Sequence, residues 1–222
     1  MKDYHCHILP EMDDGAKDVE TSEKMLEMLF EQGVDAVVLT PHYYMSKESA
    51  ESFLKRREKS FLELKKSNFN RIKYVLGAEV YLEKHISKIE YMEKLCFGSS
   101  KYILIEMPYS PIKDWMLKEL DDIYYNLQLI PIFAHLDRYI KIYTKNDYKN
   151  LLQYDCVYQF NNNELLHHKT KSVIKYFYTV TNKIIFGTDC HNLDERKPCV
   201  KNIKKGIEKN IIKWYNLVDL NF

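Results

Sequence analysis

The chain has 222 residues, and its 33 lysines and arginines almost balance its 32 aspartates and glutamates. This length suits one large domain covering residues 1–222, and the near-zero net charge excludes a protein that binds nucleic acid through its overall field. Apolar stretches are too short to span a bilayer, and Lys2, Asp3 and His5 do not belong to an apolar leader segment. We therefore expect a cytoplasmic protein with no nucleic-acid partner and no membrane insertion.

Short apolar segments alternate with segments of helical periodicity, and this alternation is typical of β-α units. The predicted strands are residues 2–6, 35–40, 72–76, 102–105, 129–133, 156–160 and 183–186. The predicted helices are residues 19–32, 46–67, 114–126, 147–152, 165–180 and 196–209. Strands separated by helices in this way indicate an α/β protein with a mostly parallel sheet or barrel.

Side chains that commonly bind metal ions gather at the predicted carboxyl ends of the strands. These side chains are His5, His7, His42, Glu79, Glu106, His135, Asp189 and His191. Because the carboxyl ends of parallel strands meet on one face of a fold, we expect all eight to converge there. Imidazole and carboxylate groups without thiolates suit Mn²⁺, Fe²⁺ or Zn²⁺, and several carboxylates allow bridging between two or three ions. A single H-x-H pair could be two ordinary histidines, so the prediction depends on the whole set.

Two pairs of these ligands are separated by one residue, at 5–7 and at 189–191. Side chains on a strand alternate between faces, so each pair points one way and can chelate one ion, while the intervening cysteine points the other way. Residues 190–196 also match the C-x5-R spacing of cysteine-dependent tyrosine phosphatases, in which a thiolate attacks phosphate. This segment contains no glycine and Cys190 faces away from the ligands, so we interpret the match as a coincidence.

Two of the five arginines closely follow ligands in the sequence. Arg138 is three residues after His135, and Arg196 is five residues after His191. A planar guanidinium beside metal ions can bind phosphate oxygens, which makes both arginines candidate phosphate-binding residues. Either one could alternatively form an ordinary surface ion pair.

Seven motifs in a fixed order carry a resemblance to a known family. They are HCHILP at residues 5–10, DDGA at 13–16, TPHY at 40–43, GAE at 77–79, IEMP at 105–108, AHLDRY at 134–139 and TDCHN at 188–192. Together they resemble the bacterial metal-dependent protein-tyrosine phosphatases of the PHP (polymerase and histidinol phosphatase) superfamily, of the type encoded with capsule or exopolysaccharide genes. The resemblance extends over about residues 1–198, and the ordered set is far more specific than any one motif.

This resemblance implies a single domain with a distorted (β/α)7 barrel and a trinuclear site that prefers Mn²⁺, with Fe²⁺, Zn²⁺ or Mg²⁺ as other candidates. It also implies dephosphorylation of tyrosines in the tail of a cognate bacterial tyrosine kinase, and hence control of extracellular polysaccharide synthesis. It places the metal ligands on the same eight residues and the phosphate-binding arginines on Arg138 and Arg196. The chain departs from the family at Glu11, at Leu136-Asp137 and at Cys190, and none of these departures removes a ligand.

The expected reaction is in-line hydrolysis of a phosphate ester. A water molecule whose pKa is lowered by cations would be hydroxide near neutral pH and would attack phosphorus directly, while Arg138 and Arg196 would stabilise the equatorial oxygens. Asp14 is our candidate general acid, although a phenolate with a pKa of about 10 needs little protonation to leave. Asp13 is a candidate for a carboxylate that supports a ligand, and both aspartates could instead only form a turn.

Two other functions remain open on the sequence alone. A histidinol-phosphate phosphatase or another small-molecule phosphoesterase would use the same metal chemistry, although the DDGA and AHxxRY motifs favour the tyrosine type. A non-catalytic, metal-stabilised binding module is the second alternative, but such a chain would be expected to lack ligands. Tyr43, Tyr44 and Tyr109 follow candidate ligands in the sequence and could line an open phosphotyrosine site.

Overall fold

The computed structural model describes residues 1–67, 69–209 and 220. Its strands are β1 (Lys2–Cys6), β2 (Ala36–Leu39), β3 (His42–Tyr43), β4 (Lys73–Leu76), β5 (Glu79–Tyr81), β6 (Tyr102–Glu106), β7 (Ile130–Phe133), β8 (Val157–Asn161) and β9 (Ile184–Gly187). They form a three-stranded sheet in the order β1-β2-β4 and a six-stranded sheet in the order β3-β5-β6-β7-β8-β9. All the pairings are parallel, as the alternation of strands and helices predicts.

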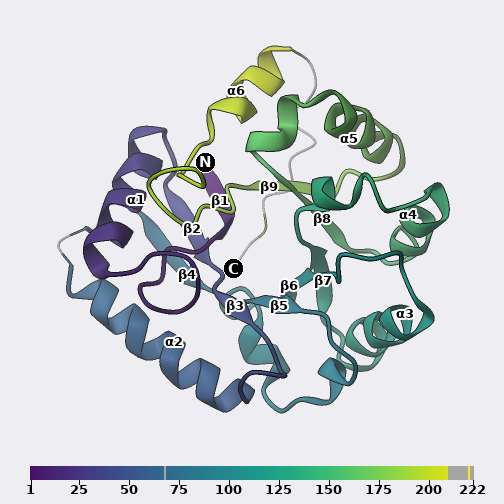
Figure 1. Ribbon diagram of the computed structural model, residues 1–222, viewed down its shortest axis with the longest axis horizontal. Coiled ribbons are helices and arrows are strands. Elements are labelled where there is room, and N and C mark those ends of the chain that lie inside the picture. The colour runs from purple at the N-terminus through teal and green to yellow at the C-terminus, as the bar shows by residue number, and fades with distance from the viewer. Residues whose placement is uncertain (68, 210–219, 221–222) are drawn as a thin grey trace.

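The two sheets face a common axis, with the helices on the outside (Figure 1). The helices are α1 (Val19–Glu31), α2 (Ala50–Lys65), α3 (Asp114–Asp121), α4 (Lys145–Leu151), α5 (His168–Val180) and α6 (Lys201–Glu208). Strands β1 and β9 come together through an isolated parallel bridge between Cys6 and Cys190, so the first and last strands are neighbours. The predicted α/β class is confirmed, and the layout resembles a barrel. The single-domain extent of residues 1–222 stays a prediction.

Strands β3 and β5 are absent from the sequence prediction. Each follows a break in a predicted strand, at Thr40-Pro41 and at Gly77-Ala78, where the chain leaves the three-stranded sheet for the six-stranded one. They pair in parallel with His42 opposite Glu79. Strands of two and three residues are too short to show a period, so hydrophobic patterning cannot detect them.

Helix boundaries differ from prediction where local hydrogen bonds intervene. Helix α2 begins at Ala50 instead of residue 46 because the Ser49 side chain accepts a hydrogen bond from the Ser52 N–H, which caps the helix there. Helix α6 begins at Lys201 instead of residue 196 because Arg196 closes a loop, donating its backbone N–H to Asn192 Oδ1. The predicted final residue of α6, Lys209, caps the observed helix.

Short helical segments complete the chain. A π-helical turn, Asp122–Asn126, continues α3, and the 3-10 turn Asn163–Leu166 precedes α5; both lie within or beside predicted helices. Three more 3-10 turns are η1 (Ile86–Lys88), η2 (Met92–Leu95) and η4 (Leu136–Tyr139). Within the described residues, none of the helices combines the length and the apolar character needed to cross a membrane.

Two hydrophobic clusters show how the strands are buried on both faces. Besides Tyr4 of β1, the smaller cluster contains one side chain from each of six further strands, namely Val38, Val75, Leu104, Ile132, Val157 and Ile185. Alternate residues of the same strands pack in the larger cluster with helix residues such as Leu26 and Phe53. The first set therefore faces the interior enclosed by the strands, and the polar residues two positions further along, such as Glu106 after Leu104, form the next layer on that face.

Candidate metal centre

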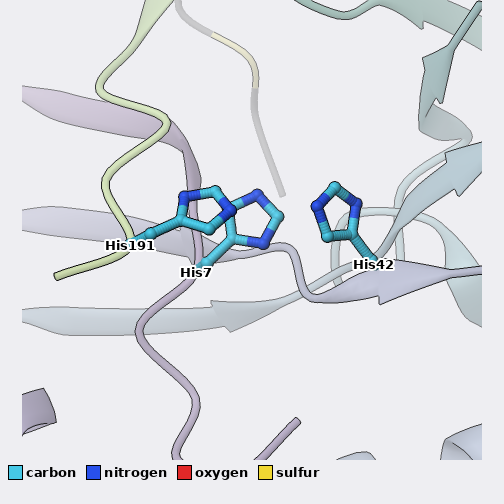
Figure 2. Close-up of side chains that lie close together, drawn as sticks. All are labelled: His7, His42 and His191. Carbon is cyan, nitrogen blue, oxygen red and sulfur yellow. The ribbon is translucent and has the colours of Figure 1, made fainter. Parts of the chain in front are cut away.

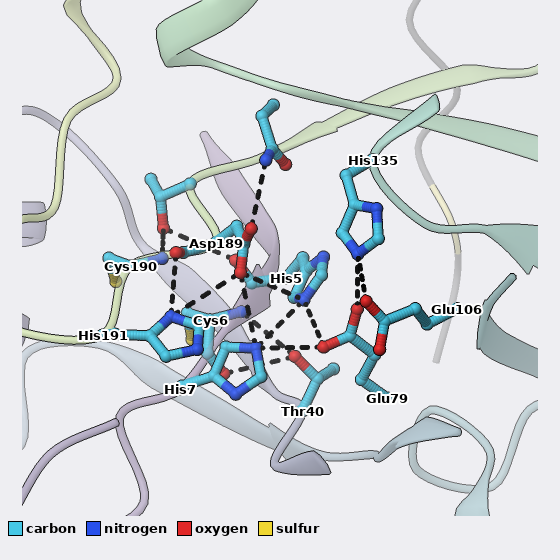
Figure 3. A network of polar contacts seen from close by, with 12 residues as sticks. His5, Cys6, His7, Thr40, Glu79, Glu106, His135, Asp189, Cys190 and His191 are labelled. Atoms are coloured by element: carbon cyan, nitrogen blue, oxygen red, sulfur yellow. Dashed lines mark hydrogen bonds and ion pairs between the residues drawn. The ribbon is translucent and has the colours of Figure 1, made fainter. Parts of the chain in front are cut away.

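The structure brings all eight predicted metal ligands together at the carboxyl ends of the strands. Figure 3 shows these residues except His42. His5 lies in β1 and His7 just beyond it, His42 opens β3, Glu79 opens β5, Glu106 ends β6, His135 follows β7, and Asp189 and His191 follow β9. Six of the eight are buried, and the other two, His42 and Glu106, are partly exposed. The cluster is therefore a largely enclosed site that opens on one side.

Glu79 is the centre of the cluster. Its Oε1 lies 2.8 Å from Nε2 of His135. Its Oε2 lies 3.2 Å from Nε2 of both His5 and His7, and 3.0 Å from Nδ1 of His42. Burial alone would raise the pKa of Glu79, but the surrounding histidines hold it well below its ordinary value. A carboxylate among four imidazoles has the arrangement needed to bridge two cations.

Asp189 forms the second anionic point. Its Oδ1 lies 3.6 Å from Nε2 of His5 and 3.5 Å from Nε2 of His7. The same oxygen accepts a hydrogen bond from Nη2 of Arg196 at 2.9 Å, while Oδ2 accepts one from Arg138. The residue has a left-handed backbone with φ of 51°, and His135 has φ of 30°. Such values are uncommon outside glycine, and strained residues of this kind cluster at functional sites.

The donor set fits metal ions. Four groups have ligand atoms within 4.8 Å of one another: His7, His42 and His191 (Figure 2); His5, His7 and Asp189; His42, Glu79 and Glu106; and Asp13, Asp14 and His42. Buried Nδ1 of His42, Oε2 of Glu79 and Nε2 of His191 have no hydrogen bond of acceptable geometry. Buried polar atoms are rarely left in this way, and divalent cations held by these groups would give the three atoms partners.

The charge state of the histidines depends on the neighbouring carboxylates. Burial lowers the pKa of His7, but Asp13 and Glu79 outweigh this effect and raise it well above its ordinary value. Burial likewise opposes protonation of His135, and Glu106 and Glu79 raise its pKa to about 9. Without a cation, these rings therefore keep a proton near neutral pH. A metal ion would have to displace it, which makes metal affinity depend on pH.

Asp13 supports two of the candidate ligands, as the sequence analysis expected. Its Oδ2 lies 2.7 Å from Nδ1 of His7 and accepts the backbone N–H of His42 at 2.8 Å. Contact with the carboxylate places a proton on Nδ1 and leaves Nε2 of His7 directed at the centre. A Cβ on Gly15 would lie 2.2 Å from the carbonyl oxygen of His7, so the turn that carries Asp13 requires glycine there.

Arg138, Arg196 and Asp14 lie at the open side. Arg138 contacts Glu106 Oε1 at 3.3 Å as well as Asp189, and its side chain is 35% exposed. Arg196 lies 3.5 Å from Oδ2 of Asp14, whose side chain is 65% exposed. Asp14 Oδ1 is also 3.4 Å from Nε2 of His191. The two guanidinium groups and the carboxylate thus border the cluster where a substrate would enter.

Two other sequence expectations concern cysteine and tyrosine. Cys190 is fully buried and its thiol contacts that of Cys6, on the side of the strands away from the ligands, as the alternation predicts. Tyr43 is buried too, with its ring 5.1 Å from that of Phe53, so the expectation that it could line the entrance is wrong. Tyr109, by contrast, is 66% exposed and lines a cavity of about 360 Å³ together with Arg138.

The chain is similar in sequence to known proteins. Residues 1–217 match the model of a family described as capsular polysaccharide synthesis, CpsB/CapC. The chain belongs to the CpsB/CapC family. Its relatives include the tyrosine-protein phosphatase CpsB of Streptococcus agalactiae, 26% identical over 212 residues that cover 89% of this chain and 86% of the relative. The tyrosine-protein phosphatase YwqE of Bacillus subtilis is 33% identical over 152 residues, covering 62% of this chain and 55% of YwqE.

Solved structures are also similar to this chain in fold. A crystal structure from the pair YwqE of Bacillus subtilis and CpsB of Streptococcus pneumoniae, described as metal-dependent tyrosine phosphatases, matches with a TM-score of 0.74 and 23% identity. The match covers 97% of this chain and 90% of that one. A histidinol phosphate phosphatase of Lactococcus lactis matches with a TM-score of 0.56 and 15% identity, over 94% and 92% of the chains. At these identities the likeness establishes the fold alone.

Two polar residues of this CpsB/CapC chain contact the ligands and were missed by the sequence analysis. Gln159 and Asn161 end β8, and their side chains contact His5 and Asp189 respectively. Glutamine and asparagine side chains bind metal ions less often than histidine and carboxylate side chains do. A search of the sequence for histidine and carboxylate residues therefore does not find them. Their place two residues apart at a strand end, where every neighbouring strand presents a ligand, is the pattern that could have indicated them.

Proposed function

We propose that this chain is a metal-dependent protein-tyrosine phosphatase that acts on phosphotyrosine in the tail of a bacterial tyrosine kinase in the cytoplasm. Such an activity would regulate capsular or extracellular polysaccharide synthesis. The observation that carries the proposal is the cluster of eight histidine and carboxylate side chains bordered by Arg138 and Arg196. The names of the CpsB and YwqE relatives support the same activity.

The eight side chains would hold two or three ions, with Mn²⁺ as the proposed metal. When bound, divalent ions supply a water molecule of lowered pKa and positive charge for the phosphate oxygens. Glu79, as the carboxylate nearest to four imidazoles, would be one of the residues that hold the ions. Asp13 holds His7 in the orientation that directs Nε2 inward.

The arginines would bind and orient the phosphoryl group. Each already contacts a carboxylate oxygen of Asp189, an anion with the planar two-oxygen geometry that guanidinium groups bind well. Hydroxide attacks phosphorus opposite the tyrosine oxygen, a new P–O bond forms, and the bond to the tyrosine oxygen breaks. The leaving phenolate takes a proton from water or from Asp14, which lies at the entrance. No phosphorylated enzyme residue is needed.

Hydrolysis of a phosphotyrosine peptide by metal-stripped protein, with Mn²⁺, Zn²⁺ or Mg²⁺ added back, tests this function. We expect turnover only after metal addition, its loss in His7→Ala, and its retention in Cys190→Ser. His168→Ala is the matched control, since His168 is exposed and lies outside the cluster. Because a phenolate leaves readily, we expect Asp14→Asn to lower kcat by about tenfold or less.

The same assay separates the alternatives. Preference for histidinol phosphate over the peptide would keep the metal chemistry and replace the substrate. Turnover that ignores chelation and disappears in Cys190→Ser would contradict the metal mechanism. Metal binding without turnover of either substrate would indicate a binding module.

A further inference from the structure

Strand β8 differs from its neighbours because it provides none of the eight candidate ligands, although β7 and β9 on either side lead into three of them. Its inward positions at the carboxyl end are Gln159 and Asn161, which share a face because they are two residues apart. Gln159 is fully buried. An amide placed at such depth needs partners for both its oxygen and its nitrogen, and the partners here lead to metal ligands.

Contacts at the two ends determine the orientation of both amides. The backbone N–H of His135 donates to Gln159 at 2.6 Å, so the atom it meets must be the amide oxygen. At the other end, Asn161 lies 3.1 Å from Oδ2 of Asp189, and only the amide nitrogen can donate to a carboxylate. Nε2 of Gln159 therefore donates to Oδ1 of Asn161, at 3.0 Å, and the chain of hydrogen bonds has one direction.

The same oxygen of Gln159 lies 3.0 Å from Nδ1 of His5. An amide oxygen can only accept, so Nδ1 of His5 carries a ring proton, and Nε2, which lies 3.2 Å from Oε2 of Glu79, is the nitrogen left to bind an ion. His7 has a different partner, the carboxylate of Asp13. The two histidines of the H-x-H pair are thus oriented in the same way through Nδ1, one by a neutral group and the other by an anion.

We propose that Gln159 and Asn161 form an amide relay that fixes the ring tautomer of His5 and the carboxylate orientation of Asp189, and so preforms the metal site between β1 and β9. Both are positioning residues, because they touch the ligands and not the ions or the phosphate. The inference rests on the proposed metal centre and does not depend on which phosphate ester is hydrolysed.

Metal binding measured without substrate tests the relay. Zn²⁺ or Mn²⁺ is titrated into metal-stripped wild type, Gln159→Leu, Gln159→Glu and Asn161→Ala. We expect Gln159→Leu to weaken the affinity about 10- to 100-fold, the usual effect of removing a partner of a metal ligand. Gln159→Glu keeps an acceptor for His5 and should recover most of the affinity. Gln153→Leu, an exposed glutamine near β8, is the control and should bind as the wild type does.

The tautomer of His5 gives a second readout that a merely structural role would not change. Nitrogen chemical shifts of histidine-labelled, metal-free protein, recorded at a pH high enough for the rings to be neutral, should show His5 in the Nδ1–H form in wild type and Gln159→Glu. In Gln159→Leu, His5 should lose that single form. A folded Gln159→Leu that keeps this tautomer and binds metal within twofold of wild type would overturn the proposal. If that variant does not fold, a metal affinity of Asn161→Ala equal to that of wild type would overturn the proposal instead. Phosphate release is assayed separately, so a wild type that binds metal without turnover contradicts only the proposed function.

Discussion

At the scale of single residues, the candidate metal centre depends on side chains that can be recognised in the sequence. It also depends on contacts between them that cannot be predicted from the sequence. The convergence of the eight candidate ligands and both arginines could be predicted because histidine, carboxylate and arginine at strand ends are uncommon combinations. The central place of Glu79 could not, since it depends on His42 lying opposite it in a two-residue strand. The contacts of Gln159 and Asn161 in β8 could not be predicted either, because glutamine and asparagine occur in many polar environments.

Substitution of Arg138 tests whether catalysis requires the planar guanidinium group to bind phosphate. Arg138→Lys keeps the positive charge but loses the two-pronged geometry, so we expect kcat/KM for a phosphotyrosine peptide to fall about 10- to 100-fold. Metal affinity should change little, because the arginine is not a ligand. Arg71→Lys, at an exposed arginine beside Glu27, is the control. Equal kinetics of Arg138→Lys and wild type would remove Arg138 from the phosphate-binding role.

Substitution of Gly187 tests whether the close approach of β9 to β1 is needed for stability and metal binding. A Cβ at this position would lie 2.5 Å from Cβ of His5 and 3.2 Å from Nε2 of Gln159, so Gly187→Ala must push β1 away. We expect a loss of about 1–3 kcal/mol in unfolding free energy, together with weaker metal binding. Urea unfolding and metal titration measure the two effects. Gly33→Asn is the control, since nothing lies within 4 Å of a Cβ there, and it should leave metal binding unchanged. If Gly187→Ala changed neither the unfolding free energy nor the metal affinity, β1 could move away from β9 without loss of stability.

At the scale of secondary structure, long periodic segments were predicted well and short ones were not. All seven predicted strands and six predicted helices exist, because buried apolar runs and amphipathic stripes leave a period in the sequence. The short strands β3 and β5 and the 3-10 turns leave none, since they depend on tertiary contacts. The 3-10 turn η1 shows this dependence: Glu119 of α3 accepts the backbone N–H groups of His85 and Ser87 and the Ser87 hydroxyl.

Glu119→Gln tests that anchor. The amide would direct N–H toward N–H donors, and we expect a loss of about 1.5–3 kcal/mol in unfolding free energy. Burial opposes ionisation of Glu119, but the hydrogen bonds from Ser87 and His85 lower its pKa overall. Its contribution is therefore present above the unfolded-state pKa of about 4.3 and is lost as pH falls through the lower folded-state pKa. Urea unfolding over that range should show the difference from wild type shrinking, whereas Glu90→Gln, at an exposed site, should show little difference at any pH.

At the scale of the whole molecule, the metal centre draws on both sheets and on six strands or their immediate continuations. The isolated bridge between Cys6 and Cys190 joins β1 to the segment that follows β9, and candidate ligands flank the bridge in both segments. Ions bound there would link the first and last strands of the described fold. Metal binding should therefore stabilise the entire molecule and not only a loop.

Metal removal tests this coupling. Adding Mn²⁺ to stripped protein at about 100 times its dissociation constant should contribute about 2.7 kcal/mol and raise Tm by about 5–10 °C. The rise should be smaller at lower pH, because the raised pKa of His7 keeps a proton on the ring that the metal has to displace. Calorimetry of wild type and His7→Ala measures the effect. A Tm independent of metal in wild type would show that the ions do not hold the strands together.

The meeting of β1 with β9 has a consequence for the timing of synthesis. A ribosome exposes the H-x-H pair first and reaches Asp189 only 182 residues after His7, which takes roughly 10–40 s at about 5–20 residues per second. During that interval His5 and His7 lack the carboxylate and the histidine that complete their side of the site. A chain interrupted before β9 lacks Asp189 and His191, so we expect it to bind an ion less tightly and to gain less stability from the ion than the finished chain does.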